Sequence, residues 1–232
     1  MNASAPDSSD SYLDHDSNDG VLVDSDVIQE MVRTPVSLRD DRYEKAYVEC
    51  LALAIDLRGF SSFTLEADRD RVTLFLEKYT QELLAAVNGY SVSYYKLLGD
   101  GALVIWDEPE PQDAEACRDL FRLLREVVTD IALAYESTCA LAGALALGTL
   151  YKYEIFGECS GLKYRDYVGY ALNTAFRLQT LAHPGELVAA PAVDTRFGLG
   201  APLMENDRKP ERSSIKGIRD EDYDGIVVVE RP

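Results

Sequence analysis

Two aspartates stand where extended segments of the chain end. Asp56 follows the apolar run of residues 46–55, and Asp100 lies in a Gly-Asp-Gly turn between residues 94–98 and 102–106. If these segments pair side by side, the two carboxylates meet. Nearby carboxylates repel unless a cation lies between them, and Mg²⁺ binds one or two carboxylates together with waters and substrate phosphates. The pair therefore indicates a divalent-metal site, and two unrelated turn residues are the alternative, because Asp-Gly is a strong hairpin signal.

A second group of polar residues lies on one predicted helix. Asn173 and Arg177 are four positions apart, so they share a helix face. A planar guanidinium suits the charge on a phosphoryl group, and an amide can orient a sugar oxygen. Taken alone, the two residues are better explained as an ordinary polar helix face.

Hydrophobic patterning predicts the elements that must position these residues. Two segments have helical periodicity and four read as strands, in the order strand 46–60, helix 69–89, strands 90–97 and 102–106, helix 112–136 and strand 137–156. The pattern then adds a helix and two strands, over 170–182, 186–191 and 222–230. The order β-α-β-β-α-β predicts an α+β fold of the ferredoxin-like, split βαβ type. We expect a mainly antiparallel sheet with two helices on one face and the other face left to solvent or a partner.

The formal net charge of −18 is concentrated at the start of the chain. Residues 1–30 contain eight acidic residues and no Lys or Arg, and they are rich in Ser and Asn. Such a composition is typical of disorder. We predict an acidic, disordered tail over residues 1–44 and one folded domain over residues 45–232.

The composition also excludes some partners. So acidic a chain does not favour nucleic acid, because phosphate binding needs clustered positive charge. The longest apolar run, residues 139–151, is shorter than the roughly 20 residues that a membrane helix needs, so we expect no membrane association. The four cysteines are scattered without a Cys-x-x-Cys pair. We therefore expect reduced thiols and a cytoplasmic location.

Three segments together resemble the catalytic domain of the class III nucleotidyl cyclases. They are "IDLRGFSSF" at 55–63, "KLLGDGALVIW" at 96–106 and "YRDYVGYALNTAFRLQTLAHPGELVAA" at 164–190, and they follow in the family's order. The likeness extends from about residue 46 to about residue 230 and includes Ile-Lys-Gly at 215–217.

The resemblance implies a site for two divalent cations, Mg²⁺ or Mn²⁺. By motif position, Asp56 and Asp100 are the metal ligands, and the backbone carbonyl of Leu57 is a further ligand. The backbone that would cradle the substrate's phosphates is that of Leu57, Arg58, Gly59 and Phe60.

The resemblance also implies a substrate and an assembly. Lys96 and Asp166 fall where the family reads the base, Asn173 where it orients the ribose, and Arg177 where it stabilises the transition state. The family forms a head-to-tail homodimer whose active sites lie at the interface. One subunit supplies the metal aspartates and its mate supplies the other four residues.

The implied reaction converts a nucleoside triphosphate to a 3′,5′-cyclic nucleotide and pyrophosphate. A lysine donates and a carboxylate accepts, so Lys96 and Asp166 favour ATP, and CTP presents the same edge. Lone cyclase domains of this size also resemble the pyrimidine cyclases of bacterial antiphage (antiviral) Pycsar systems, which use CTP or UTP. A nucleotide-binding, ferredoxin-like dimer without turnover is the non-enzymatic alternative. A diguanylate cyclase is disfavoured, because the chain lacks a Gly-Gly-Asp/Glu-Glu-Phe run.

Overall fold

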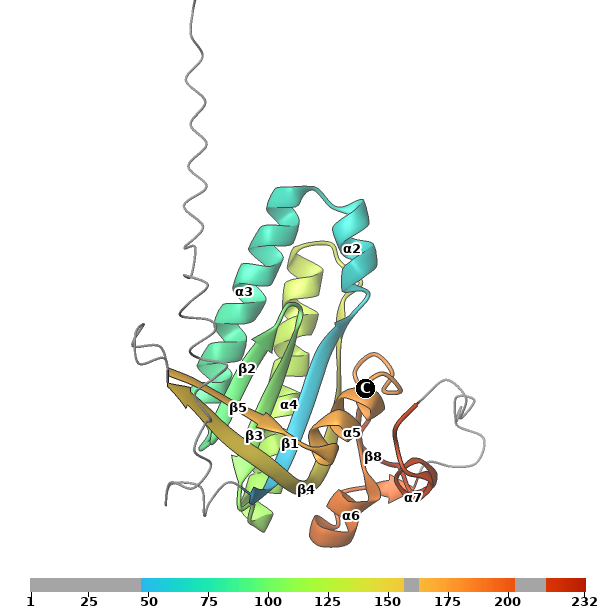
Figure 1. Cartoon of the computed structure of the whole chain (residues 1–232). Coiled ribbons are helices and arrows are strands. Elements are labelled where there is room, and N and C mark those ends of the chain that lie inside the picture. The colour runs from blue at the N-terminus through green and yellow to red at the C-terminus, as the bar shows by residue number, and fades with distance from the viewer. Residues whose placement is uncertain (1–46, 157–162, 203–215) are drawn as a thin grey trace, which may run out of the picture. The chain divides into compact units, whose positions relative to one another are not determined.

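The computed structural model describes residues 47–156, 163–202 and 216–232 (Figure 1). Its strands are β1 Tyr47–Arg58, β2 Tyr94–Leu98, β3 Gly101–Asp107, β4 Ala140–Phe156, β5 Lys163–Val168, β6 Leu187–Ala189, β7 Ala201–Pro202 and β8 Val227–Glu230. Its helices are α2 Phe60–Glu66, α3 Arg69–Asn88, α4 Pro111–Ala134, α5 Tyr170–Gln179, α6 Pro191–Phe197 and α7 Asp220–Asp224. The predicted tail, residues 1–44, lies outside the described residues.

The strands form one sheet whose order explains how distant segments meet. Along the sheet the strands run β2-β3-β1-β4-β6-β8-β7, and β5 pairs with β4 off this path. The first four strands, with α3 and α4 as their connections, form the split βαβ arrangement. β1 pairs antiparallel with both β3 and β4, and the described pairs are antiparallel except for β4 with β6. The predicted α+β class and antiparallel sheet are confirmed.

Each face of the sheet carries its own hydrophobic core. On one face Leu51, Leu53 and Ile55 of β1 are buried with apolar side chains of α3 and α4, as the helical periodicity predicts. On the other face the residues between them, such as Ala52 and Ala54, are buried with α5. This alternation is the two-residue period of a strand.

The second face is more covered than the sequence suggested, because α5 packs on it. The sheet residues beneath α5 are small, and a Cβ built at Gly148 would lie 3.1 Å from the Cβ of Ala171 on that helix. A larger residue would push the helix away. The expectation of a face left wholly to solvent or a partner is therefore wrong where α5 lies.

Past its last described partner in β1, the long strand β4 forms an arm with β5. β4 is 17 residues long, and its last β1 partner is Tyr151. From Tyr151 to Phe156 it pairs antiparallel with Lys163–Val168. We call residues 151–156 and 163–168 the β4–β5 arm. Figure 1 shows the arm crossing the sheet beside β2 and β3.

Two local expectations are wrong. The first strand ends at Arg58 rather than at residue 60, and the helix α2 begins at Phe60, with the N–H of Phe63 bonded to the carbonyl of Gly59. Residues 222–224 belong to α7 rather than to the last strand, which begins at Val227. None of the described helices combines the length and the hydropathy that a membrane crossing requires.

Candidate active site

Asp56 and Asp100 lie at the same edge of the sheet. Ile55 pairs with Ala102, so Asp56 comes opposite Gly101. Leu98 pairs with Gly101, which leaves Gly99 and Asp100 as the two turn residues, with Gly99 at a positive φ of 69°. Strand pairing thus brings both aspartates to the tip of the β2–β3 hairpin.

A glycine lets the hairpin approach β1 closely at this point. A Cβ built at Gly101 would lie 2.7 Å from the carbonyl oxygen of Ile55 and 3.3 Å from Oδ1 of Asp56. The first distance is too short for any side chain. Gly101 is therefore required for Asp56 and Asp100 to lie near one another.

The two carboxylates interact electrostatically. Burial raises the pKa of Asp100, and the charge of Asp56 raises it further. Asp56 also has a cationic neighbour, since its Oδ2 lies 3.5 Å from the guanidinium of Arg58. The same guanidinium donates to the carbonyl oxygen of Gln179 at the end of α5. Arg58 thus links the aspartate pair to that helix.

The residues present fit a divalent cation with oxygen ligands. The hydroxyl of Tyr79 is buried and has no hydrogen-bond partner among the described residues. Burial, and then the charges of Asp56 and Asp100, raise the pKa of Tyr79, so a polar group without a partner lies within electrostatic reach of both acids. Within the described segments no three His, Cys, Asp or Glu side chains gather. Two carboxylates suit Mg²⁺, which keeps several waters, better than a structural zinc site with four protein ligands.

Residues 57–60 turn the chain from β1 into α2. Leu57 is buried beneath α3 and α4, which fixes the backbone beside Asp56. Gly59 has a φ of 82°, a left-handed conformation that suits glycine. The ring of Phe60 lies 6.4 Å from that of Phe63 and 6.1 Å from that of Phe75. The predicted phosphate-binding segment is therefore held by packing on both sides.

Lys96 and Asp166 meet across the sheet and the arm. Nζ of Lys96, on β2, lies 2.5 Å from Oδ2 of Asp166, on β5. The other carboxylate oxygen accepts hydrogen bonds from the hydroxyl of Tyr94, at 3.3 Å, and from the backbone N–H of Tyr167, at 2.9 Å. A carboxylate held beside an ammonium offers an acceptor and a donor together, which is a suitable reader for the edge of a base.

Asn173 and Arg177 both lie on α5. Asn173 is exposed and Arg177 is half-buried. The guanidinium of Arg177 lies against Gly217, where a built Cβ would come within 3.2 Å of it. Gly217 has a φ of 80° and belongs to the Ile-Lys-Gly motif, whose first residue lies outside the described residues. The late motif thus borders the arginine that the resemblance singles out.

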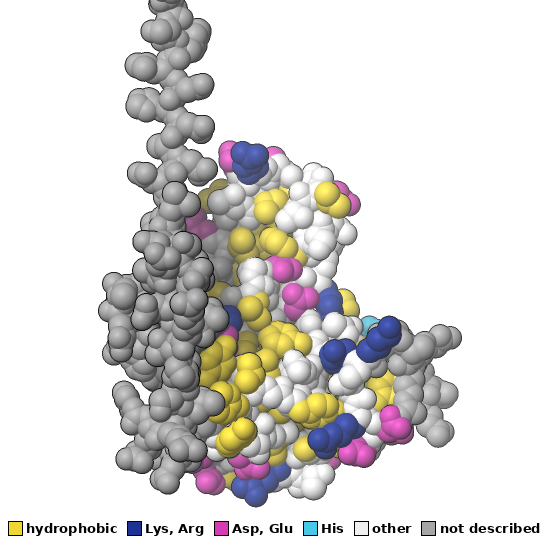
Figure 2. Space-filling view, in the orientation of Figure 1, with side chains coloured by type: hydrophobic (Ala, Val, Ile, Leu, Met, Phe, Trp, Pro, Cys, Tyr) yellow, Lys and Arg dark blue, Asp and Glu magenta, His cyan; other side chains and the backbone are white. Residues whose placement is uncertain are grey.

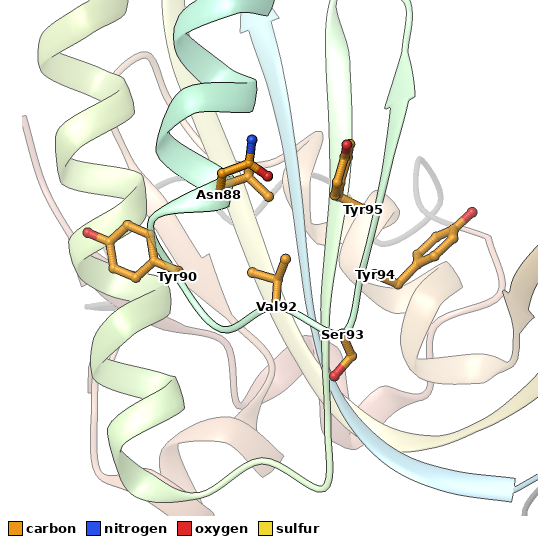
Figure 3. A pocket seen from close by; sticks show the side chains of 7 residues that line it. Asn88, Tyr90, Val92, Ser93, Tyr94 and Tyr95 are labelled. Atoms are coloured by element: carbon orange, nitrogen blue, oxygen red, sulfur yellow. The ribbon is translucent and has the colours of Figure 1, made fainter.

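A cavity lies apart from the aspartate pair. Its volume is about 330 Å³, and it lies between the end of α3 and the start of β2 (Figure 3). The residues lining it are Val87, Asn88, Tyr90, Val92, Ser93, Tyr94 and Tyr95. Of these residues, Tyr94 also contacts Asp166. The cavity supplies no further charged group.

Sequence reasoning missed two aromatic neighbours of Lys96 and Asp166. Tyr94 precedes Lys96 by two positions, so the strand period could have placed both on one face. Tyr167 follows Asp166 directly, and its ring lies 5.1 Å from that of Tyr94. The Arg58 side chain was also missed, because only the backbone of that segment was assigned.

The fold is that of nucleotidyl cyclase catalytic domains. A crystal structure of the adenylyl cyclase CyaB from P. aeruginosa has a TM-score of 0.67 at 16% identity, covering 80% of this chain and 95% of that one. A crystal structure of the guanylyl cyclase Cya2 has a TM-score of 0.62 at 20% identity, covering 78% of this chain and 90% of that one. The guanylate cyclase domain of RhGC from Catenaria anguillulae, in complex with GTP, has a TM-score of 0.58 at 17% identity, covering 67% of this chain and 87% of that one. No protein-family model and no curated protein sequence matches the chain. The resemblance seen in the motifs is confirmed at the level of the fold.

Proposed function

We propose that this protein is a nucleotidyl cyclase that converts a nucleoside triphosphate to a 3′,5′-cyclic nucleotide and pyrophosphate. The observation that carries the proposal is the meeting of Asp56 and Asp100 in a fold shared with adenylyl and guanylyl cyclases. In the reaction the ribose 3′ oxygen bonds to the α-phosphorus. The bond from that phosphorus to the bridging oxygen breaks, pyrophosphate leaves, and the hydroxyl proton passes to water.

Asp56 and Asp100, with the carbonyl of Leu57, would hold two divalent cations, Mg²⁺ or Mn²⁺. Such ions acidify the attacking hydroxyl and neutralise the leaving pyrophosphate. The raised pKa of Asp100 supports this role, because a carboxylate that burial and a like charge disfavour gains most from a cation.

Other residues of the chain would orient the substrate and stabilise the transition state. The backbone of 57–60 would bind the phosphates, and Asn173 would orient the ribose. Arg177 would meet the charge that develops around phosphorus. Because nucleophile and electrophile belong to one molecule, orientation supplies much of the rate.

Lys96 and Asp166 would read the base. The lysine donates and the carboxylate accepts, and an exocyclic amine beside a ring acceptor is presented by adenine and by cytosine. ATP is therefore the favoured substrate. A pyrimidine cyclase acting on CTP or UTP in antiviral signalling is the second candidate, because the arm is rich in tyrosine next to the base-reading pair.

The active sites would lie at the interface of a homodimer. Within the described segments Asp166 forms no metal-binding group with Asp56 and Asp100. The base-reading pair of one subunit would then serve the aspartates of its mate. Figure 2 shows hydrophobic side chains gathered on one face of the molecule. The exposed apolar residues near the base-reading pair include Leu98, two positions from Lys96 on β2, and Val168, two positions from Asp166 on β5. Such a surface suits a protein partner.

Product analysis tests the proposal. The purified chain is incubated with Mn²⁺ or Mg²⁺ and an equimolar mixture of ATP, GTP, CTP and UTP, and the products are identified by mass spectrometry. We expect one dominant cyclic nucleotide and an equal amount of pyrophosphate. Asp100→Asn, which keeps the shape but removes the charge, should lower the product at least a hundredfold. Nucleotide binding without any cyclic product would instead support a binding module.

A further inference from the structure

The arm that carries Asp166 is attached to the sheet by few elements. Among the described residues β5 pairs with β4 alone, and the described part of β1 pairs with β4 only as far as Tyr151. A two-stranded ribbon is marginally stable alone. The position of Asp166 relative to Lys96 therefore depends on side chains that join the arm to the sheet.

One carboxylate gathers those side chains. Oδ2 of Asp107, the last residue of β3, accepts from the hydroxyl of Tyr167 at 3.0 Å and lies 2.9 Å from Nζ of Lys152. Tyr167 and Lys152 are directly opposite one another in the arm, one on each strand. The Asp107 carboxylate thus contacts both strands of the arm at the same pair of cross-strand partners.

Asp107 itself is firmly placed. It pairs with Cys50 of β1, its backbone N–H donates to Oγ of Ser93 at 2.9 Å, and its Oδ1 lies 3.5 Å from the Cys50 thiol. The contacts that fix it come from β1 and from the approach to β2. Asp107 is therefore a firmly held attachment point for the arm.

The anchored residue is the direct neighbour of Asp166. The backbone N–H of Tyr167 donates to Oδ1 of Asp166, and the ring of Tyr167 lies 5.1 Å from the ring of Tyr94, whose hydroxyl donates to the same oxygen. A displacement of Tyr167 would move the Asp166 carboxylate away from Lys96.

We infer that Asp107, acting through Tyr167 and Lys152, is a positioning residue that sets the base-reading geometry of Lys96 and Asp166. The inference rests on the proposed function, since it assigns Lys96 and Asp166 to the base. It gives Asp107 no contact with substrate, and it predicts an effect on base recognition rather than on the phosphates or metals.

Binding measurements separate this role from a purely structural brace. The probes are α,β-methylene ATP and α,β-methylene CTP, which cannot release pyrophosphate, and inorganic tripolyphosphate, which has no base. Each is titrated calorimetrically with Mg²⁺ into the full chain. The variants are Tyr167→Phe, which loses only the hydroxyl, and Asp107→Asn, which loses the charge. The control is Arg122→Gln, which breaks an ion pair of 2.5 Å between α4 and Glu230.

Tyr167→Phe and Asp107→Asn should each weaken binding of the better nucleotide by about tenfold or more, the lower end of the range expected for one lost hydrogen bond to a charged group. Tripolyphosphate should bind these two variants within about twofold of its affinity for the wild type. Arg122→Gln should change neither the nucleotide affinity nor the tripolyphosphate affinity. In a Lys96→Ala background, Tyr167→Phe should add nothing, because both act through the same pair.

The inference would be overturned if the two variants bound nucleotide and tripolyphosphate equally more weakly, or if they bound the nucleotide as tightly as the wild type does. It would also be overturned if the wild type bound the two nucleotide probes equally well. A chain that binds nucleotides as expected but yields no cyclic product would refute the proposed activity and leave this positioning role standing.

Discussion

At the scale of single residues, Asp100 owes its raised pKa first to burial and then to the charge of Asp56. Asp56→Asn should lower the pKa of Asp100 toward the usual range, because it removes the neighbouring charge and leaves the effect of burial. The measurement is a carboxyl-carbon NMR titration of the metal-free protein. An unchanged pKa would show that the two carboxylates do not interact.

The sign of the accompanying stability effect follows from linkage. The folded-state pKa of Asp100 is raised above its unfolded value, so the folded chain binds this proton more tightly. The contribution to the free energy of unfolding is then greatest at low pH and is lost as the pH rises through the folded pKa. Asp56→Asn should reduce that loss in denaturant titrations without metal.

Residue types and spacing could predict that Asp56 and Asp100 lie at the same edge of the sheet, because the position of each aspartate follows from the order of the strands. They could not predict that Arg58 turns back to Asp56 or that Tyr167 reaches Asp107. Those contacts depend on side-chain rotamers and on the path of the arm, which no local pattern encodes.

At the scale of elements, the approach of the β2–β3 hairpin to β1 is set by Gly101. Gly101→Ala should lower the free energy of unfolding by about 1–3 kcal/mol and activity at least tenfold. The added Cβ would lie 2.7 Å from the Ile55 carbonyl and must push the strands apart. Thermal unfolding and pyrophosphate release measure the two effects.

The control for this prediction is Gly99→Asn in the same turn. Nothing lies within 4 Å of a Cβ built there, and Asn tolerates the left-handed conformation of φ 69°. It should keep most of the activity. Equal losses in both variants would mean that turn conformation, rather than close approach, governs the site.

The long elements could be predicted and the short ones could not. α3 and α4 have many turns of apolar periodicity, and their bounds differ from the expected ranges by at most two residues. α2 has seven residues and two serines near its start, too few turns for periodicity to register. α5 on the second face was misjudged because the small size of the sheet residues beneath it, not their hydrophobicity, admits a helix.

At the scale of the whole molecule, the proposed dimer makes a complementation prediction. Asp56→Ala and Arg177→Ala should each be inactive alone, and mixing them should restore part of the activity. Each mixed dimer would hold one site with an intact metal pair and an intact arginine. The test measures cyclic product after mixing, with mixed dimers demonstrated by native mass spectrometry. No recovery in proven mixed dimers would contradict sites shared between subunits.

The ion pair between Arg58 and Asp56 has a consequence for the order in which ligands load. A divalent ion arriving at Asp56 exchanges with a cation that is already present, so the affinity measured for the ion is a difference between two attractions. The guanidinium, which also donates to the carbonyl oxygen of Gln179, then lies without its aspartate next to the segment proposed to take the triphosphate. Binding of the divalent ion should therefore raise the affinity for the nucleotide. By thermodynamic reciprocity, binding of the nucleotide should raise the affinity for the ion by the same factor.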